Sequence, residues 1–356
     1  MGGLIAWGVL AIVVLGVLGF WTYRSQRQRA NAAALSIRAP NGIDEATFVE
    51  VGGIDQWIRI RGEDRRNPVL LVLHGGPATS YMGFTPIFQP WESSFTVVQW
   101  DRRGVGKTFG RNGRSGSGEM TLDRIVADGA ELAEYLSKHL HVDKIVLLGH
   151  SMGSMIGVSM AAHRPELFYA YVGTEQIIDM AVNEAVSYRI ILERVRAQGN
   201  AKVVKQLERI GPPPYESVRV WGTKQYAAEA ADPGYRETAL NIRPMIGYSP
   251  AYSLKDLLDL VRGALFCMSK LYDQWMRFDA HRLGNRFEIP IFVIQGASDV
   301  MTPTELAENW LATVDAPHKE MIKIERGGHL VMATAPDAYL RELVGRVRPW
   351  AVREKA

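Results

Sequence analysis

The stretch Gly149–Gly153, which reads GHSMG, most constrains what this 356-residue chain can fold into. It directly follows the apolar run Lys144–Leu148 and opens a helix-like stretch, Ser154–Ala162. A buried strand that turns at once into a helix, with serine at the apex and glycine on both flanks, is typical of a nucleophile elbow. Glycine is needed because neighbouring backbone passes so close that a β-carbon would clash. The strained turn then holds the Ser151 hydroxyl clear of the backbone, near the positive end of the following helix.

Strand-like and helix-like segments alternate around this elbow. Short apolar runs ended by turn residues are typical of buried parallel strands, and runs with a helical apolar period predict the helices between them. An antiparallel hairpin of 47–51 with 56–60 precedes the alternation. The pattern predicts an α/β fold in which helices cover both faces of a mostly parallel sheet. The expected later strands are 69–73, 95–100, 144–148, 169–172, 289–294 and 320–324, and the expected long helices are 122–140, 303–314 and 337–347.

The alternation stops between about residues 178 and 287, where helical segments, a Pro-Pro-Pro breaker and many aromatic residues occur. A helical insertion between two sheet strands is expected to cap the crevice at the carboxyl ends of the strands, where open α/β sheets bind ligands. The sequence therefore predicts a core in two parts, 45–178 and 288–356, and a helical cap over 179–287.

The N-terminus carries a 20-residue stretch without a charge, Leu4–Tyr23. That length matches the thickness of a bilayer, and Trp21 and Tyr23 stand where interfacial aromatic residues occur. Cleaved signal peptides have a basic leading region and a shorter apolar core, and neither is present here. We therefore expect residues 1–23 to form a single transmembrane anchor, which makes the membrane a partner of this chain.

The orientation of this anchor follows from the basic residues Arg24, Arg27 and Arg29, which come after the apolar stretch. The positive-inside rule predicts that the large domain lies in the cytoplasm, joined to the anchor by a polar linker over 24–44. The alternative is cleavage at the small residues 32–34, which would release a periplasmic or secreted domain.

The composition excludes several classes of function. The chain has 41 basic and 38 acidic residues, a net charge of +3, and no basic stripe interleaved with aromatic residues, which argues against a nucleic-acid partner. Its single cysteine, Cys267, excludes an internal disulfide framework and a cysteine-based metal site. We expect Cys267 to be a small buried side chain, and we expect no metal and no cofactor.

Chemistry at Ser151 needs a base that removes the hydroxyl proton and a carboxylate that orients the base. In hydrolases with such an elbow, the acid and then the histidine follow the serine along the chain. Asp299 comes just past the run 291–294, and His329 comes just past the run 321–324. The sequence therefore predicts a triad of Ser151, His329 and Asp299. The alternatives are a turn or helix-capping role for Asp299 and a surface-loop position for His329.

An acyl-transfer site also needs donors for the oxyanion. The loop His74–Pro77 follows a predicted strand, and its two glycines allow the backbone to approach the substrate oxygen. The amide of Met152 is one expected donor. The other comes from Gly75 or Gly76, and we favour Gly76. His74 is expected to brace the loop.

The segment Gly104–Thr108, which reads GVGKT, is similar to a nucleotide-binding loop. That motif needs a glycine five residues before Gly106, and Asp101 occupies the position. We therefore interpret Asp101–Gly104 as a structural turn after a strand, braced by pairing between its aspartate and its arginines. No phosphate site is expected.

Three of these motifs recur in one known family. In this order, His74–Pro77, Asp101–Gly106 and Gly149–Gly153 resemble the proline iminopeptidase-like branch of the α/β-hydrolase fold, and the likeness runs from about Thr47 to Trp350. The resemblance implies an α/β-hydrolase fold with a cap. It also implies cleavage of an N-terminal proline or another small residue from peptides, with cap glutamates that hold the free amine.

Glu175 is a candidate substrate-binding residue. It lies just past the predicted strand 169–172, at the sheet edge where the site is expected to form. A carboxylate there suits a substrate ammonium group, and the alternative is a salt bridge at the hinge of the cap.

These observations predict a membrane-anchored, metal-independent serine hydrolase that acts through an acyl-enzyme. We favour a proline iminopeptidase-like aminopeptidase acting on short peptides. The alternative is a carboxylesterase or lipase-like enzyme acting on a small-molecule ester, because the same scaffold hosts both activities. A third possibility is a non-catalytic binding protein on a hydrolase fold.

Overall fold

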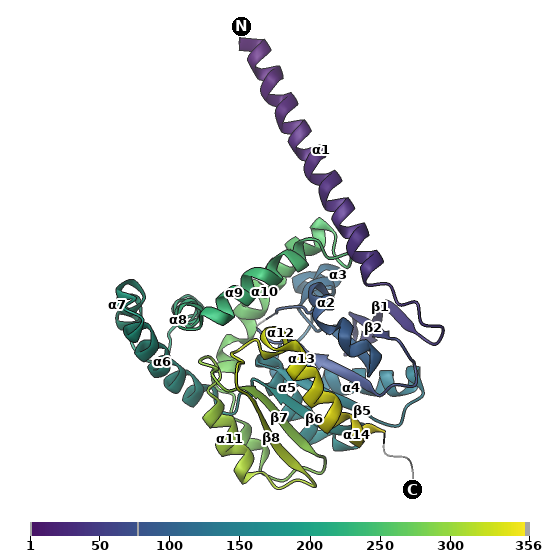
Figure 1. The fold of residues 1–356 in the computed structure, drawn as a ribbon, viewed down its shortest axis with the longest axis vertical. Coiled ribbons are helices and arrows are strands. Elements are labelled where there is room, and N and C mark those ends of the chain that lie inside the picture. Colours follow the sequence, from purple (N-terminus) through teal and green to yellow (C-terminus); the bar gives the residue numbers. More distant parts are fainter. Residues whose placement is uncertain (1, 77, 353–356) are drawn as a thin grey trace.

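The computed structural model describes residues 2–76 and 78–352 and contains one sheet with strand order β1-β2-β4-β3-β5-β6-β7-β8 (Figure 1). β1 pairs with β2, and β2 with β4, in antiparallel fashion, and the remaining pairs are parallel. The predicted fold class, an α/β-hydrolase fold with a mostly parallel sheet, is confirmed. The strands are β1 (Ile43–Val51), β2 (Ile54–Gly62), β3 (Val69–Leu73), β4 (Thr96–Asp101), β5 (Ile145–His150), β6 (Phe168–Thr174), β7 (Ile291–Gly296) and β8 (Lys319–Ile324).

Each face of the sheet carries its own hydrophobic core. In β3 the side chains of Val69, Leu71 and Leu73 enter one core, and those of Leu70 and Val72 enter the other. Successive residues of a strand point to opposite faces, so a strand covered on both sides must be apolar throughout. This requirement explains the uninterrupted apolar runs of the central strands.

Helices cover both faces (Figure 1). The first core includes residues of α4 (Leu122–Leu140), α5 (Met152–His163) and α11 (Thr304–Thr313). The second core includes residues of α13 (Pro336–Glu342) and of the π-helical turn η5 (Leu343–Val347). The other helices of the core are α2 (Thr85–Phe88), α3 (Gly106–Gly116), α12 (Val331–Thr334) and α14 (Arg348–Ala351), with 3-10 turns η1 (Met82–Phe84), η2 (Gln89–Ser93), η3 (Pro165–Leu167) and η4 (Ala280–Leu283).

Five helices between β6 and β7 form the cap among the described residues. The side chains of Ile191, Val195, Val203 and Leu207 belong to a small hydrophobic core within the cap. These helices extend from beside the base of the N-terminal helix to the far left of the view (Figure 1). They are α6 (Met180–Ala197), α7 (Ala201–Ile210), α8 (Val218–Ala231), α9 (Pro233–Gly247) and α10 (Leu254–Met276).

The N-terminal helix α1 (Gly2–Ala34) is continuous and projects from the domain (Figure 1). Its segment Ile5–Ala34 contains an 18-residue window with a mean hydropathy of 2.2, and no part of that window is buried in the protein. Among the described residues it is the one helix long and apolar enough to cross a membrane. Its length and composition suit a membrane anchor or a signal sequence.

The end of α1 is docked onto the cap, which differs from the polar linker expected over 24–44. Arg24 is buried, and its Nη2 donates to the Tyr252 carbonyl at 2.7 Å. Gln28 Nε2 donates to the Ser249 carbonyl at 2.7 Å, and Asn31 Nδ2 donates to the Tyr248 carbonyl at 2.9 Å. We call the segment 248–252 between α9 and α10 the docking loop. Residues 24–34 are helical because alanine, glutamine and arginine favour helix and because these contacts hold that helix against the cap.

Candidate active site

The elbow has the strained geometry that its glycines imply. Ser151, between β5 and α5, has φ 53° and ψ −124°. A β-carbon on Gly149 would lie 2.6 Å from the Gly153 carbonyl oxygen, and one on Gly153 would lie 2.2 Å from the Leu73 carbonyl oxygen. The Ser151 amide donates to the Thr174 carbonyl of β6 at 2.9 Å. Packing and hydrogen bonding therefore hold the serine in a conformation that an isolated chain would avoid.

Ser151, His329 and Asp299 lie together at the carboxyl end of the sheet. Ser151 Oγ is 3.1 Å from His329 Nε2, and His329 Nδ1 is 3.0 Å from Asp299 Oδ2. All three side chains are buried. Asp299 follows β7 and His329 follows β8, and the parallel pairing of these strands brings both loops to one edge. This arrangement allows a proton to move from the serine to the imidazole while the carboxylate stabilises the resulting positive charge.

A further residue, Thr302, fixes the carboxylate. The amides of Met301 and Thr302 donate to Asp299 Oδ1 at 2.7 and 3.0 Å, and the Thr302 hydroxyl donates to Oδ2. Asp299 therefore forms a local turn, which was the alternative to a triad role, and it contacts His329 as well. A threonine three residues after an aspartate was the available sequence signal, and it indicates a turn rather than a catalytic environment.

Electrostatics couple the two titratable groups. Burial opposes ionisation of Asp299, but the charge of His329 and the hydrogen bonds from His329 and Thr302 outweigh it and lower the pKa of that carboxyl. Burial likewise opposes protonation of His329, but Asp299 outweighs it and raises the pKa of the imidazole. The site is therefore built to hold an imidazolium opposite a carboxylate, which is the charge state that follows proton removal from serine.

The loop that follows β3 lies directly against the elbow. A β-carbon on Gly75 would lie 3.0 Å from the Ser151 Cβ, so glycine is needed for this approach. The Gly75 amide donates to the Tyr81 hydroxyl at 3.2 Å. Within the described part of the chain, the amides of Gly76 and Met152 have no hydrogen-bond acceptor. Both residues line the cavity at Ser151, and Pro77 lies outside the described residues.

Arg102 holds this loop from behind. Its guanidinium is buried and donates to the carbonyls of His74 at 2.9 Å and of Gly76 at 3.2 Å. The expected pairing inside the 101–104 turn is wrong: Arg103 Nε donates to Asp128 Oδ2 at 2.8 Å, whereas Asp101 accepts from the amide of Lys107. Arg102, which directly follows β4, thus ties the loop of His74, Gly75 and Gly76 to the sheet.

Glu175 lies beneath the site and is absent from the cavity wall. It is fully buried with φ 45°, and its Oε1 accepts from the Val331 amide at 2.9 Å. Its Oε2 is 2.6 Å from His150 Nε2, and His150 Nδ1 is 2.5 Å from the Tyr81 hydroxyl. Burial raises the pKa of Glu175, and His150 partly offsets the rise. Glu175 thus contacts the elbow histidine, which in turn contacts the tyrosine that holds the Gly75 amide.

We expect Glu175→Gln to lower kcat about tenfold, because the close contact between the Glu175 carboxylate and His150 behind the elbow loses its charge. The KM for a substrate with a free amine should stay within about twofold, since Glu175 does not reach the cavity. Steady-state kinetics on an ester and an aminoacyl amide provide the measurement. Glu166→Gln, an exposed carboxylate at the other end of β6, is the matched control. A rise in KM for the amine-bearing substrate alone would instead make Glu175 an ammonium-binding residue.

The triad opens into a cavity of about 390 Å³ between the core and the cap. Its wall is mostly apolar, and several cap residues contribute polar groups. The apolar side chains include Phe84, Phe88, Ile177, Met180, Ile242 and Met332. Within residues 2–76 and 78–352, no group of three His, Cys, Asp or Glu side chains is placed to hold a metal ion. Cys267 is buried, and burial raises the pKa of its thiol to about 12.

The chain is similar to several known hydrolases. A probable aminopeptidase, YbaC from Bacillus subtilis (strain 168), is 28% identical over 307 residues, which cover 84% of this chain and 95% of the relative. A solved proline iminopeptidase-related protein from Thermus thermophilus has a TM-score of 0.58 at 18% identity and covers 87% of this chain and 99% of its own. A solved bacterial membrane phospholipase A has a TM-score of 0.63 at 13% identity and covers 96% of this chain and 97% of its own.

The family comparison is consistent with this geometry. The model of the alpha/beta hydrolase fold matches residues 68–336, a span that includes Gly75, Gly76, the elbow, Asp299 and His329. This span is well over half of the sequence, so the chain belongs to the α/β-hydrolase fold family.

Proposed function

We propose that the protein is a serine hydrolase that cleaves its substrate through an acyl-enzyme. The observation that carries the proposal is the continuous chain of hydrogen bonds from Ser151 through His329 to Asp299, at the wall of an apolar cavity. A binding protein on the same fold would need neither the strained serine nor the aligned imidazole. These features therefore favour catalysis over binding alone.

In the proposed reaction His329 Nε2 takes the proton of Ser151 while Oγ attacks the substrate carbonyl carbon. The amides of Met152 and Gly76 stabilise the oxyanion, and Asp299 stabilises the imidazolium. His329 then protonates the leaving oxygen or nitrogen, which departs and leaves an ester on Ser151. A water molecule, deprotonated by His329, attacks this ester, and collapse of the second intermediate releases the acid and restores the serine.

The cavity favours an ester with an apolar acyl group as the substrate. Most of its wall is aliphatic or aromatic, and a substrate with a matching apolar chain would gain about 25 cal/mol for each Å² removed from water. The free amine of a peptide would need an unpaired carboxylate on that wall. Two carboxylates line the cavity. The Oε2 of Glu184 lies 3.1 Å from the buried ammonium of Lys224, so its charge is already compensated, and Glu229 shares its part of the wall with Arg243.

An aminopeptidase is the second candidate. The similarity to a probable aminopeptidase over most of both chains supports it. Glu229 also lines the cavity and is placed to meet a substrate ammonium near the cap. Glu229 is therefore the residue on which this alternative depends.

A direct comparison of two substrates tests these candidates. We expect the full-length protein to hydrolyse a short-chain nitrophenyl ester at least about a hundredfold faster, by kcat/KM, than prolyl naphthylamide, because the cavity wall is mostly apolar and Lys224 already compensates Glu184. Glu229→Gln should leave ester hydrolysis within about twofold. Preferred turnover of the naphthylamide, lost in Glu229→Gln, would establish the aminopeptidase instead.

We also propose that α1 stays attached as a membrane anchor, with the domain in the cytoplasm. Cleavage after residue 34 would remove Arg24, Gln28 and Asn31 from the docking loop and expose the groups they bind. Basic residues at the end of the apolar segment favour the cytoplasmic side. An alkaline phosphatase fused after residue 40 should be inactive, and an active fusion would place the domain on the opposite side.

A further inference from the structure

We propose that the outer face of the cap contacts the lipid bilayer and that amphiphilic acyl esters with an anionic head group enter the catalytic cavity from the membrane between α8 and α9. The substrate part of this inference rests on the esterase activity proposed above. The membrane-contact part does not depend on that activity.

The first observation is that no spacer separates the anchor from the cap. The uncharged segment Leu4–Tyr23 spans about 30 Å at about 1.5 Å per residue, which is the thickness of the hydrocarbon core. The next residue, Arg24, already donates to the carbonyls of Gly247 and Tyr252. The docking loop is therefore held at the level of the lipid head groups, and the ends of α9 and α10 that adjoin it lie at the same level.

The second observation is where apolar side chains are exposed. Outside α1, every large exposed apolar side chain among the described residues lies on the cap except Val352 near the C-terminus. On α10, Leu258, Val261 and Leu265 are 56%, 60% and 63% exposed. Their spacing of three and four residues puts them on one face of the helix. We call these three residues the α10 stripe.

The charge around the α10 stripe suits an anionic lipid surface. Lys255 and Arg262 are exposed on the same helix, on either side of Leu258. Both contact the single carboxylate of Asp259, at 2.6 and 3.6 Å, so this group of three keeps one positive charge in excess. A helix face that combines leucine with basic residues is typical of helices that lie in the membrane interface. The N-terminal segment agrees, because no acidic residue precedes Asp44 and the arginines at 24, 27 and 29 lie at the expected membrane boundary. A bilayer therefore matches both the apolar and the charged groups of this face.

The third observation is a crevice on the cap that adjoins the catalytic cavity. A crevice of about 340 Å³ on the cap is lined by residues of α8 and α9, and it shares Glu229 and Arg243 with the catalytic cavity. Tyr226 and Leu240 line the crevice and are 56% and 52% exposed. Arg236 supplies a second guanidinium beside Arg243. With the Glu229 carboxylate on the same wall, the two guanidinium groups leave one positive charge in excess, and together with the apolar groups they fit an acyl chain joined to an anionic head.

Helix α9 is suited to act as the movable wall of this crevice. None of its side chains between residues 234 and 247 is fully buried, and Ile242, Met245 and Ile246 are half-buried where they pack against the second core. The contacts of α9 are therefore more exposed to solvent than those of the buried core helices, which favours local opening. Its end at Gly247 adjoins the docking loop, which α1 holds. The proposed contact with the bilayer thus lies next to the end of α9 that joins the docking loop.

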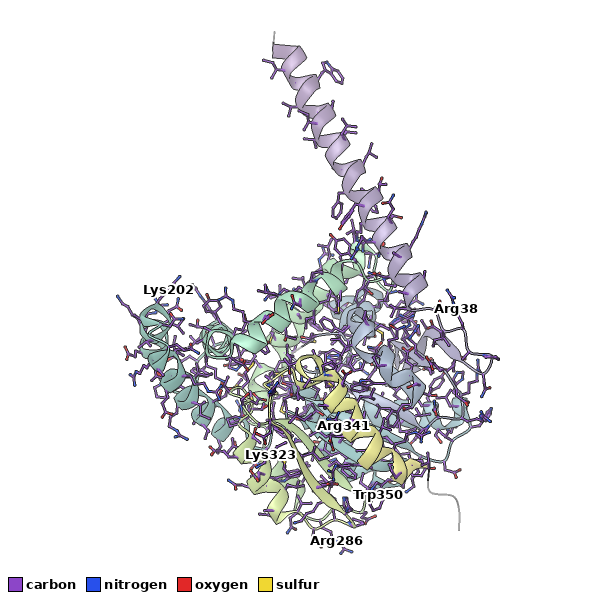
Figure 2. The ribbon with its side chains drawn as sticks, in the orientation of Figure 1. Arg38, Lys202, Arg286, Lys323, Arg341 and Trp350 are labelled. Carbon is purple, nitrogen blue, oxygen red and sulfur yellow. The ribbon has the colours of Figure 1, made fainter. Side chains whose placement is uncertain are left out.

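The membrane contact can be measured without activity. Cys267 is the only cysteine and is buried, so a cysteine introduced at Leu265→Cys can be labelled selectively with an environment-sensitive fluorophore. In full-length protein reconstituted into phosphatidylglycerol-containing vesicles, we expect a blue shift and about twofold quenching by brominated lipid acyl chains. The matched control is Arg286→Cys, whose position lies at the end of the domain away from α1 (Figure 2). Equal quenching at both positions, or none at Leu265→Cys, would overturn the proposal. Shielding at Leu265→Cys that depends on protein concentration rather than on lipid would also overturn it, because a second copy would then cover the face.

The entry of substrate needs a separate measurement. The variant Leu258→Ser/Val261→Ser/Leu265→Ser should hydrolyse a soluble short-chain ester at the wild-type rate. It should hydrolyse the acyl ester bonds of phosphatidylglycerol in vesicles about tenfold more slowly than the wild type. Replacement of the same three residues by isoleucine should preserve both rates. Equal loss on both substrates would indicate damage to the fold and contradict the proposal. If the wild-type protein hydrolyses neither ester, the proposed function fails, whereas the fluorescence result still decides the membrane contact.

Discussion

Ser151→Ala should reduce kcat by at least about 10⁴-fold and abolish labelling by a fluorophosphonate probe. The expected loss is this large because Ser151 Oγ lies 3.1 Å from His329 Nε2 at the cavity wall, so alanine removes the nucleophile itself. The fold should survive, because the Ser151 amide, rather than its side chain, makes the hydrogen bond to the Thr174 carbonyl.

Ser159→Ala is the matched control for this experiment. Ser159 lies on the same helix, and its hydroxyl donates to the Met155 carbonyl at 2.8 Å, away from the triad. Its activity and labelling should equal those of the wild type. Measurements of both variants by circular dichroism and by active-site labelling separate chemistry from folding. Turnover retained in Ser151→Ala would refute the assignment of the nucleophile.

Asp299→Asn should lower kcat by about 10³- to 10⁴-fold and change the pH profile. In the wild type, Asp299 raises the pKa of His329 from its ordinary value of 6.5, and the imidazole must be neutral to accept the serine proton. The kcat/KM of the wild type should therefore fall on the acidic side with a midpoint above 6.5. In Asp299→Asn the midpoint should move to lower pH, because the carboxylate that favours the imidazolium is gone.

These two effects have different causes and are separable. At high pH, where the imidazole is neutral in both proteins, the lower kcat of Asp299→Asn reports the lost orientation of the imidazole. The midpoint of the pH profile reports the pKa of the imidazole. Asp337→Asn, an exposed aspartate on α13, should change neither quantity. A variant whose midpoint stays at the wild-type value would show that Asp299 does not act on His329.

The sheet and the positions of Ser151, Asp299 and His329 were predictable because both depend on a local sequence pattern. In that pattern an apolar run forms a buried strand, and a polar residue follows it. A buried parallel strand must be apolar on both faces, and the residue after such a strand lies at the sheet edge. Ser151, Asp299 and His329 each follow an apolar run, so the parallel direction predicted for these strands brings them to one edge of the sheet.

Other features depend on contacts that spacing does not reveal. The pairing of Arg103 with Asp128 and that of Glu175 with His150 are set by how helices and loops pack. In α8 and α9, Gly222 and Pro244 interrupt the helical pattern, so these helices were not distinguished within the cap. Residues 24–34 were expected to belong to a linker because they are polar. The docking loop that binds them lies about 220 residues later in the sequence, so local sequence does not reveal the contact.

The position of Arg102 behind the loop of His74, Gly75 and Gly76 has a consequence for the transition state of the proposed reaction. In a trans peptide the carbonyl and the amide point in opposite directions. The Gly75 carbonyl oxygen lies 3.0 Å from His74 Nδ1, so the amide of Gly76 points away from that ring. Arg102 meanwhile holds the flanking carbonyls of His74 and Gly76. The dipoles of this loop are thus oriented before substrate arrives, and little reorganisation free energy remains to be spent when the oxyanion forms.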